Sequence, residues 1–273
     1  MLKSNTNIIN RDGDLIYITF PKLLGSKAVR CVFTTRAGGV SEGPLSSMNM
    51  GFGRGDRREN VIENYRRICS SSGIDISHLV FSKQTHTANV RTVTEKDRLT
   101  GFTLPSFEDI DGLVTNRRGV ALVTQYADCT PLLFCDPKKR VIASAHSGWK
   151  GTVQQIGAVT VNKMKEEFGC DTKDIIAVIG PCIGSCCYEV DDPVYRQFEA
   201  LPFDLSDIFF PCSPGHYMLD LRRANEKILL GAGIKKENIE ISDICTCCNS
   251  KEMFSHRALG AERGNLAAII ELI

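Results

Sequence analysis

Residues 126–152 read YADCTPLLFCDPKKRVIASAHSGWKGT, and this stretch decides much of the fold. Two apolar runs on either side of the turn residues DPKK predict a strand, a turn and a second strand. Cys129 precedes the first run, His146 ends the second, and the only tryptophan of the chain, Trp149, follows. A buried core would favour Val and Ile at such places. Three alternatives therefore arise: packing, a nucleophile with its base, or two ligands of a metal.

Further apolar runs predict more strands than helices along the chain. The other strand-like segments are residues 15–20, 29–35, 79–84, 89–94, 119–125, 174–180 and 266–272. Helical periodicity occurs in residues 59–73, 151–169 and 220–233. We expect Gly73 and Gly169 to be C-caps and Asp220 to be an N-cap.

The order of these elements indicates the fold class. Because the strands do not alternate one for one with helices, the pattern argues against a doubly wound sheet or a TIM barrel. We expect an α+β fold, a layered α/β/β/α sandwich with mixed sheets. The chain shows neither an internal repeat nor a linker, so residues 1–273 are expected to form a single domain.

The composition is that of an ordinary globular protein. The chain has 273 residues, 42% of them hydrophobic and 24% charged, which is enough for a well-buried core. Lys and Arg total 33 against 32 Asp and Glu, and the net charge of +1 offers no basic field for nucleic acid or anionic lipid. The polar start lacks a secretory core, and the longest apolar run is too short for a bilayer. We therefore expect a cytoplasmic protein with neither nucleic-acid nor membrane partners.

Three side chains that suit catalysis or metal binding stand where predicted strands stop. His86 lies between two strand-like runs, Cys129 follows ALVTQYAD, and His146 precedes the flexible Gly148. A Cys–His hydrolase would use the thiolate with one imidazole as base, whereas a mononuclear zinc site would take all three and leave a fourth position open. A multicopper centre needs more imidazoles than 5 histidines without a His-x-His pair can supply, so we reject it.

An ordered series of motifs covers nearly the whole chain. They are TTRAGGVSEGPLSSMNMG (34–51), KQTH (83–86), DGLVT (111–115), ADCTP (127–131), AHSGWKGT (145–152), IGPCIGSCCYEV (179–190), LDLRRAN (219–225), CT (245–246) and FSHR (254–257). In this series the sequence resembles the laccase-domain family, first labelled multicopper polyphenol oxidases and later recognised as zinc-dependent purine nucleoside phosphorylases. The resemblance implies that His86, Cys129 and His146 bind one zinc ion. Ser147 stands where the family usually has Ala.

The resemblance also implies a reaction. Adenosine, inosine, guanosine and S-methyl-5'-thioadenosine would react with phosphate to give the free base and the ribose 1-phosphate, and adenosine would also be deaminated. Phosphate needs a cationic pocket beneath the anomeric carbon. We expect Arg36, next to Gly38 and Gly39, to bind it, with Lys150 and Arg257 as further candidates, although Lys150 suits a solvated surface better.

Two neighbours of the predicted ligands allow both a functional and a structural interpretation. Asp128 would orient a ligand imidazole or carry a proton, and it would equally cap a turn. It is therefore a catalytic candidate beside Cys129, His146 and His86. Trp149 is expected to pack in the core behind His146 and not to stack on a base.

Of the 12 cysteines, the 11 other than Cys129 fall into two groups. Isolated buried thiols are expected at Cys31, Cys69, Cys135, Cys170 and Cys212. The clusters PCIGSCC and CTCC contain Cys182, Cys186, Cys187, Cys245, Cys247 and Cys248. Together they would supply a four-thiolate zinc site, but they lack the usual Cys-x2-Cys spacing. Because the family resemblance takes in Cys182, Cys187 and Cys245, we favour small buried residues packed near the site over a second metal. Cys186, Cys247 and Cys248 have no assigned role.

Two functions of other classes compete with nucleoside chemistry. A Cys–His amidase or deamidase would use Cys129 and His146, and the family fold resembles that of a bacterial toxin deamidase. Metal content separates this alternative from a zinc enzyme. Bacterial relatives have also been assigned an editing role on a muramyl precursor of peptidoglycan, which a substrate panel would separate. The sequence leaves the oligomeric state open.

Overall fold

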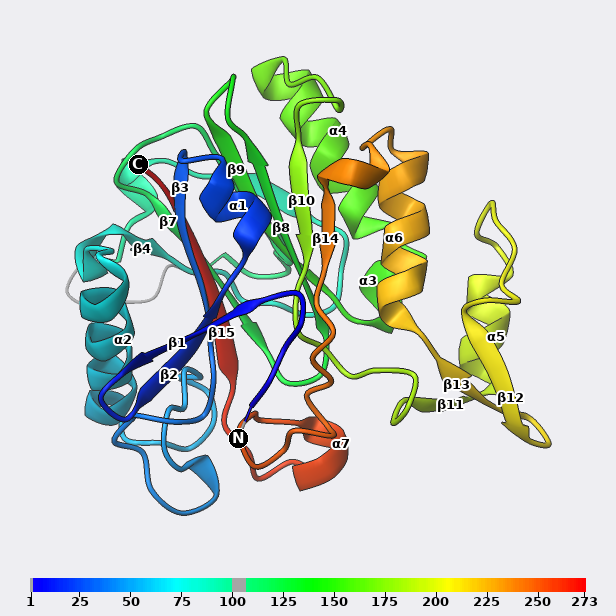
Figure 1. Cartoon of the computed structure of the whole chain (residues 1–273), viewed down its shortest axis with the longest axis horizontal. Helices are drawn as coiled ribbons and strands as arrows, with labels where there is room; N and C mark the ends of the chain where they lie inside the picture. Colours follow the sequence, from blue (N-terminus) through cyan, green and yellow to red (C-terminus); the bar gives the residue numbers. More distant parts are fainter. Residues whose placement is uncertain (1, 100–106) are drawn as a thin grey trace.

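Two six-stranded mixed sheets lie face to face at the centre of the molecule, with helices on both outer sides (Figure 1). The computed structural model describes residues 2–99 and 107–273. The first sheet has the order β1 (Ile8–Asp12), β2 (Leu15–Thr19), β3 (Val29–Thr34), β15 (Leu266–Leu272), β7 (Ala121–Tyr126) and β4 (Leu79–Val80). The second has the order β14 (Ile239–Ile241), β10 (Ile176–Ile179), β8 (Thr130–Asp136), β9 (Val141–Ser147), β6 (Gly112–Thr115) and β5 (Val90–Thr92).

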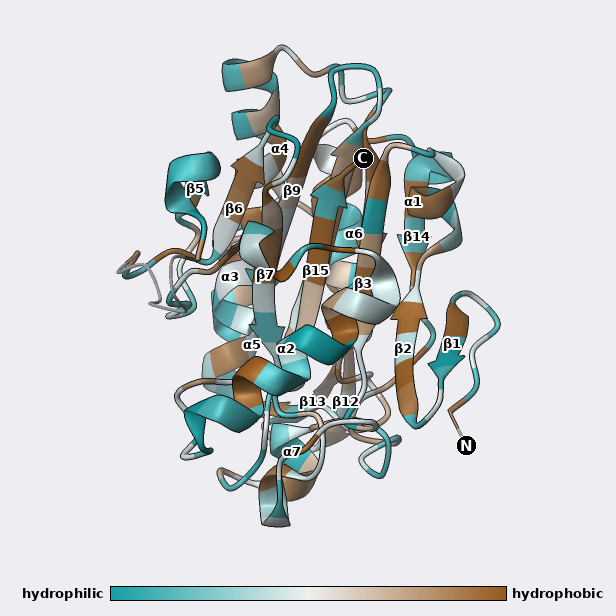
Figure 2. Cartoon of the chain, turned by 90° about the vertical axis from the view of Figure 1, so that its left-hand side faces the viewer, coloured by the Kyte–Doolittle hydropathy of each residue, from teal (hydrophilic) through white to brown (hydrophobic). Residues whose placement is uncertain are grey.

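Neighbouring residues of the central strands point into different layers, because side chains alternate along a strand. Leu122 of β7, Ile270 of β15 and Leu133 of β8 join the apolar layer between the two sheets. Val123 and Ile269, one residue away on their strands, pack on the outer face of the first sheet. Both faces of the first sheet are therefore apolar here, and the ribbons of β15 and β9 are mostly brown in Figure 2.

Helices cover the two outer faces and complete the α/β/β/α arrangement. The first sheet is covered by α2 (Arg58–Ser72), and the second by α4 (Ile156–Phe168) and α6 (Leu221–Gly231). Shorter helices are α1 (Pro21–Gly25), α3 (Trp149–Val153) and α7 (His256–Leu259). The expected layered α+β fold with mixed sheets is confirmed.

The helix ends that the sequence predicted have the expected geometry. Gly73 and Gly169 end their helices in the left-handed conformation, at φ of 70° and 66°. Glycine adopts this conformation without the steric cost of a Cβ. The side chain of Asp220 accepts a hydrogen bond from the backbone N–H of Arg223 and so caps α6.

The helix predicted over residues 151–169 is broken in two, which corrects the sequence analysis. Its first turn belongs to α3, and α4 begins only after Gln155, whose φ is +55°. The side chain of Gln154 donates a hydrogen bond to the backbone carbonyl of His86, at 3.2 Å. A continuous apolar periodicity hides this break, since a left-handed residue leaves no mark in the hydrophobic pattern.

A small third sheet projects to one side of the sandwich (Figure 1). It consists of β11 (Glu189–Asp191), β13 (His216–Leu219) and β12 (Phe209–Ser213), and α5 (Asp192–Phe198) packs on it. Its apolar cluster continues onto α6 through Leu221 and Ala224. These strands are short and mostly exposed, so no hydrophobic pattern predicts them from the sequence.

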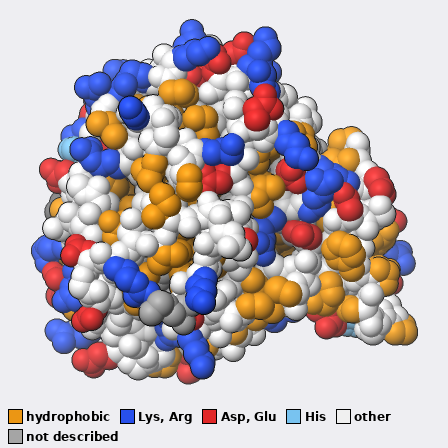
Figure 3. Space-filling model, in the orientation of Figure 1, with side chains coloured by type: hydrophobic (Ala, Val, Ile, Leu, Met, Phe, Trp, Pro, Cys, Tyr) orange, Lys and Arg blue, Asp and Glu red, His pale blue; other side chains and the backbone are white. Residues whose placement is uncertain are grey.

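The surface carries mixed charge. On the face shown in Figure 3, Lys and Arg side chains are interspersed with Asp and Glu. This mixture agrees with the net charge of +1. Within residues 2–99 and 107–273, no helix combines the length and the apolar character needed to cross a membrane.

Candidate metal centre

Two imidazoles and one thiol meet where strands of both sheets end. The ligand atoms of His86, Cys129 and His146 all lie within 4.8 Å of one another. The Sγ of Cys129 is 3.8 Å from Nε2 of His86, and the two imidazole ring centroids are 4.9 Å apart. Donor atoms around a tetrahedral zinc ion with N and S ligands are separated by about 3.3–3.8 Å. The structure thus brings the three predicted ligands together at a spacing that suits one metal ion.

The β8–β9 hairpin places two of these ligands. In its antiparallel register Pro131 pairs with His146, so Cys129 lies just beyond the strand end and beside the imidazole. Gly148 directly follows the end of β9. A Cβ added there would lie 2.9 Å from Sγ of Cys129 and 2.9 Å from Cδ2 of His86. Glycine is required because any side chain would enter the centre.

Asp111 is the carboxylate that orients His146, and the sequence analysis missed this role. Its Oδ1 lies 2.8 Å from Nδ1 of the imidazole, and its backbone carbonyl accepts the backbone N–H of His146, also at 2.8 Å. This leaves Nε2 as the ring nitrogen available to a metal. A carboxylate behind a ligand imidazole fixes the ring and its tautomer. The motif DGLVT, which opens at Asp111, was the available signal.

The same carboxylate holds the loop that carries His86. Backbone N–H groups of Thr85, His86 and Thr87 donate to the two oxygens of Asp111, at 3.0, 3.0 and 2.8 Å. His86 itself has a φ of +68°, an uncommon conformation that these bonds stabilise. One buried carboxylate therefore positions both imidazole ligands.

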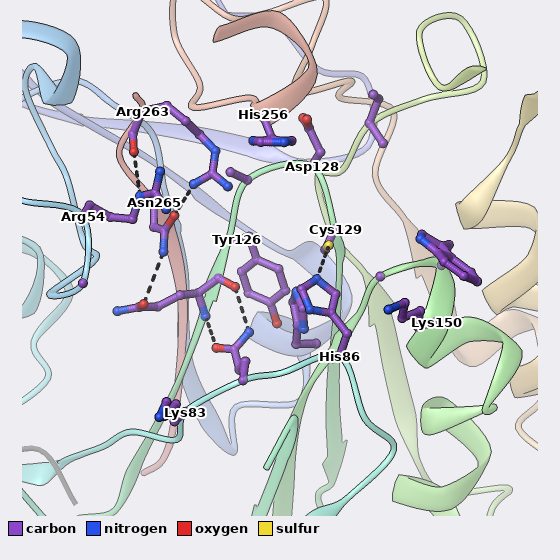
Figure 4. A pocket seen from close by; sticks show the side chains of 18 of the residues that line it. Arg54, Lys83, His86, Tyr126, Asp128, Cys129, Lys150, His256, Arg263 and Asn265 are labelled. Atoms are coloured by element: carbon purple, nitrogen blue, oxygen red, sulfur yellow. Dashed lines mark hydrogen bonds between the residues drawn. The ribbon is translucent and has the colours of Figure 1, made fainter. Parts of the chain in front are cut away.

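Gln84 anchors the start of this loop to β7. Its side chain pairs with the backbone of Gln125 through two hydrogen bonds: Nε2 donates to the carbonyl at 2.9 Å, and Oε1 accepts from the N–H at 2.7 Å (Figure 4). These bonds attach the loop to the edge of the first sheet, while Asp111 attaches it to the second. The KQTH motif thus joins the two sheets at the centre.

The electrostatics of the centre favour a thiolate. Burial disfavours the charged thiolate, but the charge and hydrogen bond of His146, followed by those of His86, outweigh burial and lower the pKa of Cys129 to about 6. Burial likewise opposes the charge on His146, yet the Cys129 thiolate and Asp111 raise its pKa to about 9. Burial would raise the pKa of Asp111, but the hydrogen bonds from His146 and Thr87 lower it to about 2. The sulfur is therefore an ionised ligand near neutral pH.

The centre opens into a cavity of about 980 Å³. Cationic side chains are spread around its wall: Arg54, Lys83, Lys150, Arg257 and Arg263. Figure 4 shows Arg54 and Arg263 on one side of the His86–Cys129 pair and Lys150 on the other. The cavity can therefore hold an anion and a small organic molecule together beside the centre.

Arg54 and Arg263 form a cationic pair that the sequence analysis did not predict. Burial, together with the charge of Arg54, lowers the pKa of Arg263 to about 10. Among the described residues the buried Nε of Arg263 has no hydrogen-bond partner. Two adjacent guanidinium groups with a free buried donor suit an anion. Short glycine-rich segments around both residues gave no recognisable signal.

Arg36 lies elsewhere, which corrects its expected role in phosphate binding. Its Nε donates to the carbonyl of Ser46 at 2.9 Å, its Nη1 donates to the carbonyl of Ser250 at 3.0 Å, and its guanidinium stacks on Phe254. It is not among the residues that line the cavity. These contacts connect loops, so Arg36 has a structural function.

The glycines after Arg36 also serve packing. Gly38 has a φ of +88°, and a Cβ there would lie 2.3 Å from Cα of Leu15. A Cβ on Gly39 would lie 2.1 Å from the carbonyl oxygen of Ser47. Close approach of two backbone segments, and not of an anion, explains this glycine pair.

Arg257 and Lys150 both line the cavity. The guanidinium of Arg257 also donates to the backbone carbonyls of Cys187, at 3.3 Å, and Glu189, at 2.8 Å. Lys150 lies near Trp149, with Nζ 5.6 Å from the centroid of its ring. Trp149 packs on the apolar cluster of the small sheet and also lines the cavity, so its position differs from the expected one behind His146.

Asp128 orients backbone and not an imidazole, which corrects one of its expected roles. Its Oδ1 accepts the hydroxyl of Thr246 at 2.6 Å, and its Oδ2 accepts the backbone N–H of Arg257 at 2.7 Å. The residue lines the cavity and has a φ of +88°. It connects the turn that carries Cys129 to the segment that carries Arg257.

The cysteines outside the centre divide differently from expectation. Cys31, Cys69, Cys135 and Cys170 are buried, as predicted for isolated thiols, but Cys212 is exposed on β12. All twelve cysteines carry free thiols.

Comparison with known proteins identifies the family. The family model described as multi-copper polyphenol oxidoreductase laccase matches residues 30–273. The chain belongs to this laccase family. It is 38% identical over 247 residues to purine nucleoside phosphorylase YlmD of Bacillus subtilis, which covers 90% of this chain and 89% of that relative. It is 33% identical to adenosine deaminase RL5 of an unknown prokaryotic organism, over 90% of this chain and 96% of that one.

A solved structure of the laccase family shows the same fold. The crystal structure of YlmD from Geobacillus stearothermophilus matches with a TM-score of 0.91 at 33% identity, over 97% of this chain and 99% of that chain. The named relatives support an enzyme of the nucleoside phosphorylase type. The suspected family is therefore confirmed.

The histidines of this laccase-family chain are dispersed. His78 pairs with Glu271, and His216 pairs with Glu189 at 2.9 Å. His256 lines the cavity but is not in the group formed by His86, Cys129 and His146. Several copper ions would need clusters of imidazoles. The donors of the centre suit a single ion.

Proposed function

We propose that the chain is a zinc-dependent purine nucleoside phosphorylase that also deaminates adenosine. Adenosine, inosine, guanosine and S-methyl-5'-thioadenosine are the proposed nucleosides, with phosphate as the second substrate. One observation carries the proposal: the three predicted metal-ligand side chains and the half-buried cationic pair of Arg54 and Arg263 line the same cavity. The named relatives, purine nucleoside phosphorylases and an adenosine deaminase, support the same reactions.

His86, Cys129 and His146 would hold the zinc. Two imidazoles and a thiolate are the donors that a catalytic zinc prefers, and three protein ligands leave one position open. When bound, zinc acts as a Lewis acid that activates water and polarises a purine. Asp111 would keep the imidazole of His146 oriented toward the ion, and it holds the backbone of His86.

Arg54 and Arg263 would bind phosphate. In phosphorolysis an oxygen of phosphate replaces the purine at the anomeric carbon, so the anion must be held on one side of the ribose. The unpartnered Nε of Arg263 offers a donor for it, and the second guanidinium adds charge. Lys150 and Arg257, on other parts of the wall, would contact the nucleoside or a second phosphate oxygen.

The remaining wall of the cavity suits a nucleoside. Trp149 and Tyr188 offer aromatic surface for a purine, and both line the cavity. Asp128 would act by positioning the segment of Arg257, since its two oxygens already accept hydrogen bonds. A volume of about 980 Å³ accommodates a nucleoside together with phosphate.

A direct assay tests the proposal. Purified protein is incubated with inosine, with and without phosphate, and hypoxanthine is measured. We expect phosphate-dependent release that a zinc chelator abolishes and added zinc restores. Release that is absent at every phosphate concentration, from protein that contains zinc, would refute the phosphorylase assignment.

The low pKa of Cys129 favours a second candidate, a Cys–His amidase. A thiolate 3.8 Å from Nε2 of His86 is also the arrangement of a nucleophile with its base. Metal content and alkylation distinguish the two. A metal-free enzyme whose amidase activity is lost on alkylation of Cys129 supports the amidase, whereas a zinc-bound thiolate resists alkylation.

The free thiols support a reducing environment. We propose that the protein works in the cytoplasm, where thiols stay reduced, as one laccase-type domain over residues 1–273.

A further inference from the structure

Four cysteines of the two sequence clusters come together away from the metal centre. The Sγ atoms of Cys186, Cys187, Cys245 and Cys248 all lie within 4.8 Å of one another. Cys248 is 3.4 Å from both Cys186 and Cys187, measured between sulfurs. Cys182, which is fully buried, and Cys247, which lies within CTCC, are not members of this four-cysteine group. The expectation that Cys187 and Cys245 serve only as packed small residues is therefore too narrow.

Backbone pairing brings the two segments together. Cys182 and Cys245 form an isolated parallel bridge, and the N–H of Thr246 donates to the carbonyl of Cys182 at 3.0 Å. The carbonyl of Gly184 accepts the N–H of Cys187 at 2.9 Å and closes a turn. Both loops are thus held by main-chain bonds that do not depend on the sulfurs.

The surroundings suit thiolates. The backbone N–H groups of Gly184 and Cys248 point at Sγ of Cys245, at 3.2 and 3.5 Å. The cationic side chain of Arg222 lies beside the group. A Cβ built on Gly184 would be 2.5 Å from Nη2 of Arg222 and 3.2 Å from Sγ of Cys186, so the guanidinium and this sulfur border the same glycine. Amide donors and a guanidinium offset the negative charge that several thiolates bring to one place.

We propose that the four-cysteine group binds one zinc ion as a structural site, separate from the metal centre. Zinc–sulfur bonds of about 2.3 Å in a tetrahedron place neighbouring sulfurs about 3.8 Å apart. Two of the pairs here are at 3.4 Å, and all pairs are within 4.8 Å, so small side-chain rotations would complete the tetrahedron. Four protein ligands fill the coordination sphere, which makes the site structural and not catalytic.

The proposed ion would brace one wall of the cavity. Arg257 donates to the carbonyls of Cys187 and Glu189, and Tyr188 between them lines the cavity. On the other loop, Thr246, next to Cys245, donates to Asp128. Zinc at the four cysteines would therefore fix both loops against the residues that border the metal centre. This role does not depend on which substrate the cavity binds.

Metal content of matched variants tests the proposal. The full chain is expressed with zinc supplementation, and zinc is counted by mass spectrometry of the native protein. We expect two ions in the wild type and one in the double variant C186S/C248S. The controls C212S, an exposed thiol on β12, and C247S, a thiol in the same loop, should keep two. Loss of the second ion in C247S would show that the loop, and not the four sulfurs, determines binding.

Two further measurements use the wild-type protein, so they do not depend on whether a variant folds. In cobalt-substituted wild type we expect the intense charge-transfer absorption of a four-sulfur tetrahedral site. Peptide mapping after alkylation should show the four cysteines protected until a chelator is added, while Cys212 reacts at once. A wild type with one zinc ion, with all four thiols alkylated freely or joined as disulfides, would overturn the proposal. The inosine assay is independent of this count, so the two hypotheses can fail separately.

Discussion

The metal centre and the four-cysteine group are built in different ways. His86, Cys129 and His146 stand on strand ends and a loop that buried hydrogen bonds hold in place, with Asp111 at the middle of the network. The four-cysteine group stands on two surface loops, with Cys186 and Cys248 exposed. The first keeps an open cavity beside it, whereas the second has four protein ligands.

This difference teaches what each ion would contribute. A centre whose ligands the protein already orients gains chemistry from its ion and little stability. The loops of the four-cysteine group already pack on an apolar cluster through Ile183 and Cys245, so the ion would add a crosslink between them at the surface. Removal of one ion should therefore abolish activity, and removal of the other should mainly loosen the cavity wall. The following predictions test that contrast.

The largest effect is expected for His146→Ala. Even the loss of an outer partner of a metal ligand costs about 10–100-fold in metal affinity or activity, and the loss of a ligand costs more. Phosphorolysis of inosine and deamination of adenosine should both fall by more than about 100-fold, and one zinc ion should be lost while the four-cysteine zinc stays. Retained phosphorolysis beside lost deamination would show that only one reaction uses the centre.

Arg263→Met should come next. A hydrogen bond to a charged group is worth about 1.5–3 kcal/mol, so the phosphate KM should rise, or kcat fall, by roughly 10–100-fold without loss of zinc. Arg36→Met is the matched control. It should leave phosphate kinetics unchanged and lower the free energy of unfolding by about 1–3 kcal/mol, because Arg36 connects loops. The opposite pattern would restore Arg36 as the phosphate ligand.

Asp111→Asn should weaken the metal centre without removing a ligand. The amide keeps one acceptor oxygen, but its NH2 group would face N–H donors that the second carboxylate oxygen accepts, and it no longer carries charge behind His146. Zinc affinity at the centre should therefore drop by at least about tenfold. A chelator titration measures this, with activity as the signal. Asp109→Asn, which alters an exposed acceptor of the Thr85 hydroxyl, should titrate like the wild type. Equal affinities in both variants would remove Asp111 from this role.

The smallest effect is expected for Gly184→Ala. Its Cβ would meet the end of the Arg222 side chain, which can move, and Sγ of Cys186. We expect kcat/KM to stay within about twofold of the wild type. Gly148→Ala is the counterpart, since its Cβ would touch Cys129 and His86 directly, and it should lower zinc content and activity clearly. Similar losses of activity in Gly184→Ala and Gly148→Ala would contradict the proposed difference between the two sites.

The sequence predicts those parts of the fold in which many residues act together. The strand segments found from apolar runs, such as 131–136 and 140–146, lie in layers with apolar contacts on both faces. The hydrophobic pattern of α4 is equally clear, yet one left-handed residue, Gln155, moved its start. Short, exposed strands such as β11 carry no comparable pattern.

The residues of the site likewise differ in whether the sequence predicts their roles. That His86, Cys129 and His146 lie together was predictable, because their types and strand-end positions suggest a metal and the resemblance named them; their binding of zinc stays a prediction. Asp111 was not, since its role depends on three amides of a loop more than twenty residues away. Arg54 and Arg263 meet only in the folded chain, where Nε of Arg54 donates to the carbonyl of Arg263. Arg36 was misjudged because glycines that allow close backbone packing resemble glycines that approach an anion.

The hydrogen bonds of Asp111 arrange the centre during folding, before any metal ion binds. They hold the imidazole of His146 and the backbone of His86 in place within the protein itself, so an incoming ion would find these residues already arranged. Such donors bind copper(II) more tightly than zinc(II), and availability then decides the outcome. If the centre binds a metal as proposed, the metal supply at the time of loading would decide which ion it holds. A zinc-containing preparation and a copper-containing one would then come from the same folded chain.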